Sequence, residues 1–175
     1  MLVLGGDCTL EVGIIAGALR RSPSIALVHI DLDADLKVPA TGEVPSTGWA
    51  LPTSSTRMDA WTISRHSGLD GRCSQARTCR CFAPDNITDS EAAIIADARI
   101  TVETLASVHH STVAAAERAV EWGSRHDEMW VHVDIDVLSW VHFPIAENSR
   151  RRDGLTIDEL ATVLHLLLTA SKWRA

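Results

Sequence analysis

The fold is decided by residues 25–35, which read IALVHIDLDAD. The first six residues, Ile25 to Ile30, form a strongly apolar run, which is typical of a strand that is covered on both faces. Three alternating aspartates then follow, namely Asp31, Asp33 and Asp35. Because residues two apart on an extended chain face the same way, these three carboxylates can converge.

The residues before this strand complete a β-α-β pattern. Leu2 to Leu4 is a short apolar run, read as a strand, that stops at Gly5-Gly6. A helix is then predicted to begin at Asp7 or Thr9 and to end near Ser22-Pro23. Since two strands joined by a helix are normally parallel, we expect an α/β fold with a mainly parallel sheet.

A second acidic strand end lies near the end of the chain. Met129 to Ile135 is an apolar run that carries Asp134 and is followed by Asp136. Ligands of open α/β sheets gather at the carboxyl ends of the strands, where both acidic clusters fall. The alternative is that these aspartates only cap the turns and helices that follow the strands.

The chemistry of clustered carboxylates favours a metal site. Five carboxylates in one place repel one another and resist ionisation unless cations neutralise them. Two divalent ions would supply that charge, and such a pair can acidify a shared water and polarise a substrate. Metal-assisted hydrolysis is therefore the leading reaction class.

Local signals predict further elements in the second half of the chain. Two capping-box spacings, at Thr88 to Glu91 and at Thr156 to Glu159, each predict the start of a helix. A strand is expected at Ile100 to Val102 and an amphipathic helix at Thr112 to Trp122. His109-His110 is expected to open a helix and to face solvent.

The stretch from Thr53 to Cys81 is different in character, because it is rich in Ser, Thr, Arg and Cys and has no sustained apolar period. We expect residues 53–81 to be an irregular insertion or a disordered segment. Cys73, Cys79 and Cys81 suggest a zinc site, but a closed structural site needs a fourth ligand, and none is obvious.

Bulk composition narrows the class of protein. The chain has 175 residues, of which 46% are hydrophobic and 22% charged, so a single globular domain over residues 1–175 is expected. The net charge of -7 argues against nucleic acid as a partner. No apolar stretch is long enough to span a membrane, and residues 1–7 lack a secretory leader, so we expect a cytoplasmic protein with no membrane partner.

Three motifs, taken in order, resemble those of the arginase, agmatinase and formiminoglutamase superfamily of ureohydrolases. They are Gly5-Gly6-Asp7-Cys8, the segment from Asp31 to Asp35, and Asp134-Ile135-Asp136. Phe143 to Asn148 and Gly154-Leu155-Thr156 also look like the segments that follow the family's last motif. The resemblance implies a three-layer α-β-α fold, incomplete here because family members are considerably longer. It also implies cleavage of a C–N bond in a linear amidine or guanidino compound by a metal-bridging hydroxide.

The resemblance also implies six metal ligands and no side-chain nucleophile. By position, Asp31 and Asp134 would bridge two divalent ions, Cys8 and Asp35 would complete one site, and Asp33 and Asp136 the other. Cys8 and Asp33 stand where the family has histidine. Oxygen ligands such as Asp33 favour manganese or magnesium, with manganese preferred here, whereas a Cys8 thiolate shifts the preference toward zinc or iron. A small buried thiol is the alternative reading of Cys8.

Other positions depart from the family pattern or carry a less specific signal. Ser139 stands where the last motif has a third aspartate, and the family's histidine after the second motif has no clear match. His29 and His132 each precede an aspartate by two residues. They are either partners that orient the metal ligands or satisfied core histidines.

Two rival readings follow. One is a catalytically inactive arginase-like fragment that at most binds metal. The other is a phosphoryl-transfer enzyme of the haloacid-dehalogenase type, because Asp134 to Leu138 also resembles the nucleophile strand of that family; too little chain follows Asp136 to hold its other residues. A small guanidino or amidine molecule is the expected partner, and self-association as a homo-oligomer stays open.

Overall fold

A parallel sheet organises the part of the chain that the structure, a computed structural model, describes, namely residues 2–5, 9–22, 24–36, 79–144 and 153–171. In these residues the sheet has four strands in the order β3-β2-β1-β4. Their bounds are Ile25–Ile30 for β1, Cys79–Phe82 for β2, Thr101–Glu103 for β3 and Glu128–Val133 for β4. Each neighbouring pair is parallel, which confirms the expected α/β class.

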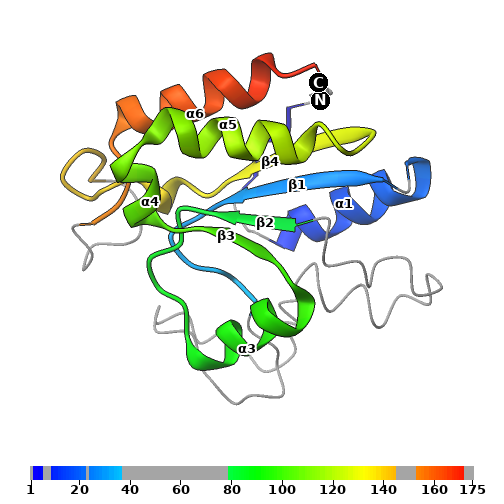
Figure 1. Cartoon of the computed structure of the whole chain (residues 1–175), viewed down its shortest axis with the longest axis horizontal. Coiled ribbons are helices and arrows are strands. Elements are labelled where there is room, and N and C mark those ends of the chain that lie inside the picture. Colours follow the sequence, from blue (N-terminus) through cyan, green and yellow to red (C-terminus); the bar gives the residue numbers. More distant parts are fainter. Residues whose placement is uncertain (1, 6–8, 23, 37–78, 145–152, 172–175) are drawn as a thin grey trace.

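Helices cover both faces of this sheet (Figure 1). The helices are α1 (Thr9–Arg21), α3 (Asp89–Ala98), α4 (Leu105–His110), α5 (Thr112–Gly123) and α6 (Ile157–Thr169), with a short 3-10 turn, η4 (Ile135–Val137). Figure 1 shows α4, α5 and α6 on one side of the sheet and α1 and α3 on the other, so the arrangement has three layers.

Strand β1 is the centre of the core. All six of its residues are buried, as predicted for a strand covered on both faces. Ala26, Val28 and Ile30 belong to the large apolar cluster that also includes residues of α5 and α6. Residues at alternate positions, including His29, therefore point to the opposite face, toward α1.

Both predicted capping boxes are present. The Thr88 side chain accepts from the backbone N–H of Glu91, and the Glu91 carboxylate accepts from the backbone N–H of Thr88, at the start of α3. Thr156 and Glu159 repeat this arrangement at the start of α6. The predicted strand at Ile100 to Val102 and the helix from Thr112 match β3 and α5 to within one residue.

Three expectations about local structure were wrong. Leu2 to Leu4 form no strand among the described residues, and Leu2 and Leu4 are 82% and 88% exposed. An apolar run this short becomes a strand only where it pairs with a neighbour. His109 and His110 are exposed as expected, but they end α4 rather than open a helix.

The third error concerns the segment expected to be irregular up to Cys81. Its last residues begin β2, which lies between β1 and β3, while residues 53–78 lie outside the described part. Cys79 and Cys81 are free thiols and belong to none of the metal-ligand groups found among the described residues. Cys73 is outside that part of the chain.

A buried ion pair explains how β2 accommodates an arginine. Nη2 of Arg80 lies 3.2 Å from Oε2 of Glu103 on β3, and both side chains are almost fully buried. Arg118 of α5 donates to the same carboxylate at 2.7 Å. Burial raises the pKa of Glu103, but hydrogen bonds from Arg118, Ser107 and Arg80 outweigh it and lower the pKa.

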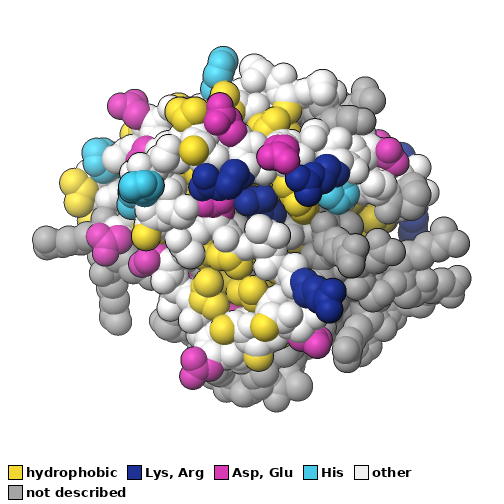
Figure 2. Space-filling view, in the orientation of Figure 1, with side chains coloured by type: hydrophobic (Ala, Val, Ile, Leu, Met, Phe, Trp, Pro, Cys, Tyr) yellow, Lys and Arg dark blue, Asp and Glu magenta, His cyan; other side chains and the backbone are white. Residues whose placement is uncertain are grey.

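The surface seen in Figure 2 has basic side chains interspersed with acidic and apolar ones. Among the described helices, none combines the length and the apolar character needed to cross a bilayer.

Candidate metal centre

The two acidic strand ends meet at one edge of the sheet. Strands β1 and β4 pair in register, with His29 opposite His132 and Ile30 opposite Val133. The backbone N–H of Asp134 donates to the carbonyl of Ile30 at 2.9 Å, just beyond the last pair. Asp31 and Asp134 therefore leave neighbouring strands side by side, as their sequence positions predicted.

The same turn follows each strand. Oδ1 of Asp31 accepts from the backbone N–H of Asp33 at 2.7 Å. Oδ1 of Asp134 accepts from the backbone N–H of Asp136 at 2.9 Å, which begins η4. An aspartate that accepts from the N–H two residues on makes an Asx turn, so one carboxylate oxygen in each strand end is fixed by the backbone.

The described aspartates of the predicted site lie close enough to share cations. Ligand atoms of Asp31, Asp33 and Asp136 all lie within 4.8 Å of one another. The same holds for the group His29, Asp31, Asp35 and for the group Asp31, His132, Asp134. Asp31 belongs to all three groups, which suits a bridging position, and Cys8 lies outside the described residues.

The electrostatics of these groups fit a cation. Burial and the charges of Asp31, Asp134, Asp33 and Asp35 raise the pKa of Asp136 from 3.8 to about 8. Oδ1 of Asp136 is buried and has no hydrogen-bond partner among the described residues. A buried, unpartnered carboxylate oxygen beside other carboxylates is costly without positive charge, so these residues fit a divalent ion with oxygen ligands.

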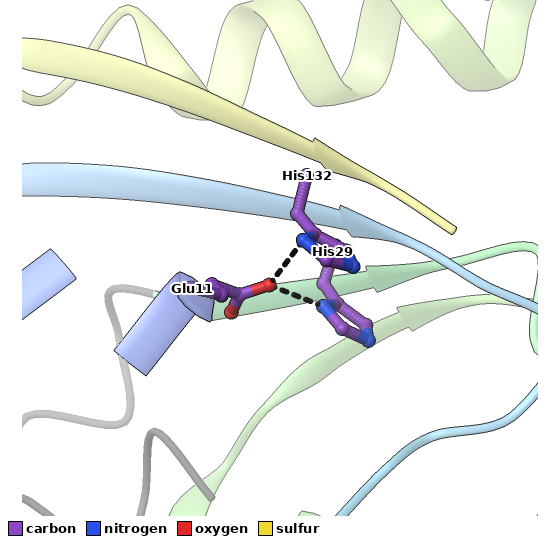
Figure 3. A group of neighbouring side chains, drawn as sticks. All are labelled: Glu11, His29 and His132. Atoms are coloured by element: carbon purple, nitrogen blue, oxygen red, sulfur yellow. Dashed lines mark hydrogen bonds and ion pairs between the residues drawn. The ribbon is translucent and has the colours of Figure 1, made fainter. Parts of the chain in front are cut away.

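A carboxylate and two imidazoles, those of Glu11, His29 and His132, form a cluster (Figure 3). Oε2 of Glu11 lies 3.0 Å from Nδ1 of His29 and 2.8 Å from Nδ1 of His132. The two rings are stacked, with centroids 4.6 Å apart and planes 7° apart. Nε2 of His29 lies 3.3 Å from Oδ2 of Asp31, so His29 joins this cluster to a predicted metal ligand.

This cluster shifts the titration of its members. Burial raises the pKa of Glu11, but His29 and His132 outweigh burial and lower that pKa to about 2. Burial lowers the pKa of His29, but the carboxylates of Glu11 and Asp31 outweigh burial and raise it well above its usual value. Glu11 is therefore an ionised carboxylate held between imidazoles.

Glu11 and Asn86 were not predicted from the sequence. Glu11 lies in the first turn of α1, where an acidic residue is commonly explained by the helix N-terminus alone. The available signal was the pair of histidines inside apolar runs, because a buried imidazole needs a polar partner. Asn86 donates from Nδ2 to Oδ1 of Asp33 at 2.9 Å, and a backbone bridge joins the same two residues.

The loop that follows η4 is held to the start of α6. Ser139, at the position of the family's third aspartate, is buried, and its N–H donates to the carbonyl of Leu155 at 2.9 Å. The N–H of Leu155 donates to the carbonyl of Val137 at 2.8 Å.

A parallel α/β sheet with carboxylates gathered at the carboxyl ends of adjacent strands defines an α/β protein with a candidate metal centre. The sequence model of the Arginase family matches residues 1–173, and the chain belongs to that family. This match overturns the haloacid-dehalogenase alternative. No curated protein matches the chain.

Solved structures agree on the fold. The chain is similar to arginase from Bacillus subtilis, with a TM-score of 0.80 and 17% identity over 98% of this chain and 58% of that one. It is also similar to arginase from Bacillus caldovelox, with a TM-score of 0.78 and 18% identity over 98% and 57%. For proclavaminate amidino hydrolase from Streptomyces clavuligerus the TM-score is 0.65 and the identity 21%, over 93% and 48%. The chain thus spans 48% to 58% of the length of these structures, and it has their α/β fold.

Proposed function

We propose that this chain is a metal-dependent hydrolase of the ureohydrolase type, which cleaves a C–N bond of a linear amidine or guanidino compound. The observation that carries the proposal is the convergence of the acidic ends of β1 and β4 into overlapping ligand groups. Arginases and an amidino hydrolase among the similar structures support the same bond type.

Two divalent ions would be held by the residues at these strand ends. Asp31 is shared by all the ligand groups at the strand ends, which supports a bridging role, and Asp134 is proposed as the second bridge. Asp33 and Asp136 would complete one site, and Asp35 with Cys8 the other. Oxygen ligands favour manganese, and a thiolate from Cys8 would favour zinc or iron instead.

The chain's own residues prepare the site in two ways. The Asx turns fix one oxygen of Asp31 and one of Asp134, so both carboxylates are oriented before a ligand arrives. The acidic edge attracts a cationic guanidinium or amidinium group. When bound, the metal ions would supply the acidified water that attacks the central carbon of that group.

The second candidate is a family member that binds metal without turnover. It is favoured by Cys8 and Asp33 in place of histidine and by Ser139 in place of aspartate. A cytoplasmic location is part of the proposal, and self-association remains an open prediction.

Turnover and metal content separate the candidates. Protein loaded with manganese is assayed for urea and amine release from arginine, agmatine and simpler guanidino compounds. The proposal expects Asp134→Ala to lose at least about 100-fold in rate, since it removes a bridging ligand. Asp97→Ala, an exposed aspartate on α3, is the matched control.

Equal rates for wild type and Asp134→Ala would overturn the hydrolase. No turnover with two bound equivalents of manganese in wild type would establish the inactive metal-binding member instead.

A further inference from the structure

His29 and His132 lie on β1 and β4, and each belongs to a group of possible metal ligands with the aspartates at the ends of these strands. They lie opposite each other on β1 and β4, and their rings stack in parallel. The side chain of His29 is only 9% exposed. Figure 3 shows both rings with one nitrogen toward Glu11 and the other directed away from it.

The contact with Glu11 fixes the tautomer of both rings. One carboxylate oxygen, Oε2, lies 3.0 Å and 2.8 Å from the two Nδ1 atoms. A carboxylate only accepts hydrogen bonds, so each Nδ1 carries its hydrogen. A metal ion that binds at Nε2 would displace any proton held there, and the lone pair of Nε2 would then be the ligand.

The Nε2 atoms meet no hydrogen-bond donor in the part of the chain that the structure describes. Both are buried and lack a hydrogen-bond partner among the described residues. Nε2 of His29 lies 3.3 Å from Oδ2 of Asp31, in a contact that is not aligned as a hydrogen bond. An imidazole nitrogen and a carboxylate oxygen approach this closely only when a positive charge lies between them, and either a proton on Nε2 or a shared cation supplies that charge.

We propose that His29 and His132 supply nitrogen ligands, through Nε2, to the cation site at the ends of β1 and β4. His29 would act with Asp31 and Asp35, and His132 with Asp31 and Asp134, whose ligand atoms lie within 4.8 Å of one another in each group. The inference rests on the proposed function, because it needs that site to hold a cation.

Glu11 is the positioning residue of this arrangement. A metal-bound histidine commonly donates its second ring N–H to a carboxylate, which fixes the ring and raises its basicity. Here a single carboxylate serves two rings. These nitrogens would add imidazole donors to a site that has Cys8 and Asp33 in place of two expected histidines, so selectivity would move from magnesium and manganese toward zinc and iron.

The test reads the nitrogen directly, without activity. Manganese(II) is bound to protein labelled with ¹⁵N in histidine only, and to unlabelled protein, and pulsed electron paramagnetic resonance records nitrogen couplings. We expect couplings whose frequencies change with the label. The variants His29→Gln and His132→Gln should each lose part of the signal, and the double variant all of it, with manganese affinity lowered about 10-fold or more.

His110→Gln is the matched control, because His110 is exposed at the end of α4, and its spectrum should equal that of wild type. Manganese bound without histidine coupling overturns this inference and leaves the cation site intact. Absence of bound manganese by elemental analysis overturns the proposed function itself, and with it this inference. If a buried-histidine variant fails to fold by circular dichroism, the comparison of labelled and unlabelled wild type still decides.

Discussion

Two acidic residues in this small site have opposite electrostatic behaviour. The pKa of Glu11 is lowered to about 2 because two imidazoles outweigh its burial. The pKa of Asp136 is raised to about 8 because Asp136 is buried beside other carboxylates. Groups with pKa values pushed apart in this way are typical of functional sites. Ionisation of Asp136 in the metal-free site is thus electrostatically unfavourable.

The raised pKa of Asp136 predicts a loss of stability with rising pH in the metal-free chain. The folded state holds this proton up to about pH 8, whereas the unfolded state releases it near 3.8. Between these values the folded state binds more protons, so stability falls as pH rises through the window. Asp136→Asn removes this term and should be more stable than wild type at about pH 8, by more than about 1 kcal/mol.

The measurement is thermal unfolding of chelator-treated protein at about pH 5 and about pH 8. Asp97→Asn, an exposed aspartate, should follow wild type at both values. A melting temperature of Asp136→Asn that falls as steeply as that of wild type would contradict the assignment. Glu11 contributes with the opposite sign, since its stabilisation is present above pH 4.5 and is lost as pH falls toward 2.

Among the elements, the link between η4 and α6 depends on a close backbone approach at Gly154. A Cβ added to Gly154 would lie 2.6 Å from the backbone N of Ser139 and 2.8 Å from the carbonyl oxygen of Val137. These backbone atoms flank the β-bridge between Leu138 and Leu155, so moving them would disturb its hydrogen bonds. We expect Gly154→Ala to destabilise the fold by about 1–3 kcal/mol, measured by urea unfolding.

Gly17→Ala is the control for that prediction. A Cβ at Gly17, in α1, meets no atom of the described residues within 4 Å. Alanine should therefore stabilise the helix by about 0.5–1 kcal/mol. Equal changes in the free energy of unfolding for Gly154→Ala and Gly17→Ala would show that the close backbone approach at Gly154 does not affect stability.

The junction of β2, β3 and α5 depends on the buried carboxylate of Glu103. Glu103→Gln leaves Arg80 buried with no full counter-charge, a change that costs about 3–5 kcal/mol when one partner of a buried pair is lost. Glu121→Gln removes an exposed pair with Arg125, for which about 0.5 kcal/mol or less is expected. Denaturant unfolding of both variants tests this difference, and equal costs would refute it.

For the whole molecule, cation binding should stabilise the fold. A ligand that binds only the folded state at about 100 times its Kd adds about 2.7 kcal/mol. We therefore expect manganese to raise the melting temperature of wild type and a chelator to reverse the change. Asp134→Ala should show little of this shift, and an equal shift in both proteins would place the bound ion elsewhere.

The sequence predicted those parts of the molecule that local signals determine. Strand β1, both capping boxes and the meeting of the two acidic strand ends were predicted from patterns a few residues long, and the role of the aspartates as metal ligands stays a prediction. Strand β2 was missed because Cys79-Arg80-Cys81 looks polar until Glu103, distant in sequence, neutralises the arginine. Glu11 was missed for the same reason, since its partners His29 and His132 lie on two strands far along the chain.

The in-register pairing of β1 with β4 has a consequence for how this site can change over time. The hydrogen-bonded register of β1 and β4, rather than the connecting segments, sets the spacing between the acidic ends of the two strands. Insertions or deletions in those connections leave that spacing unchanged. A register shift of one residue would instead turn every ligand side chain on one strand to the opposite face of the sheet. The connecting segments can therefore vary in length and sequence while the register of β1 and β4 keeps the two acidic strand ends in place.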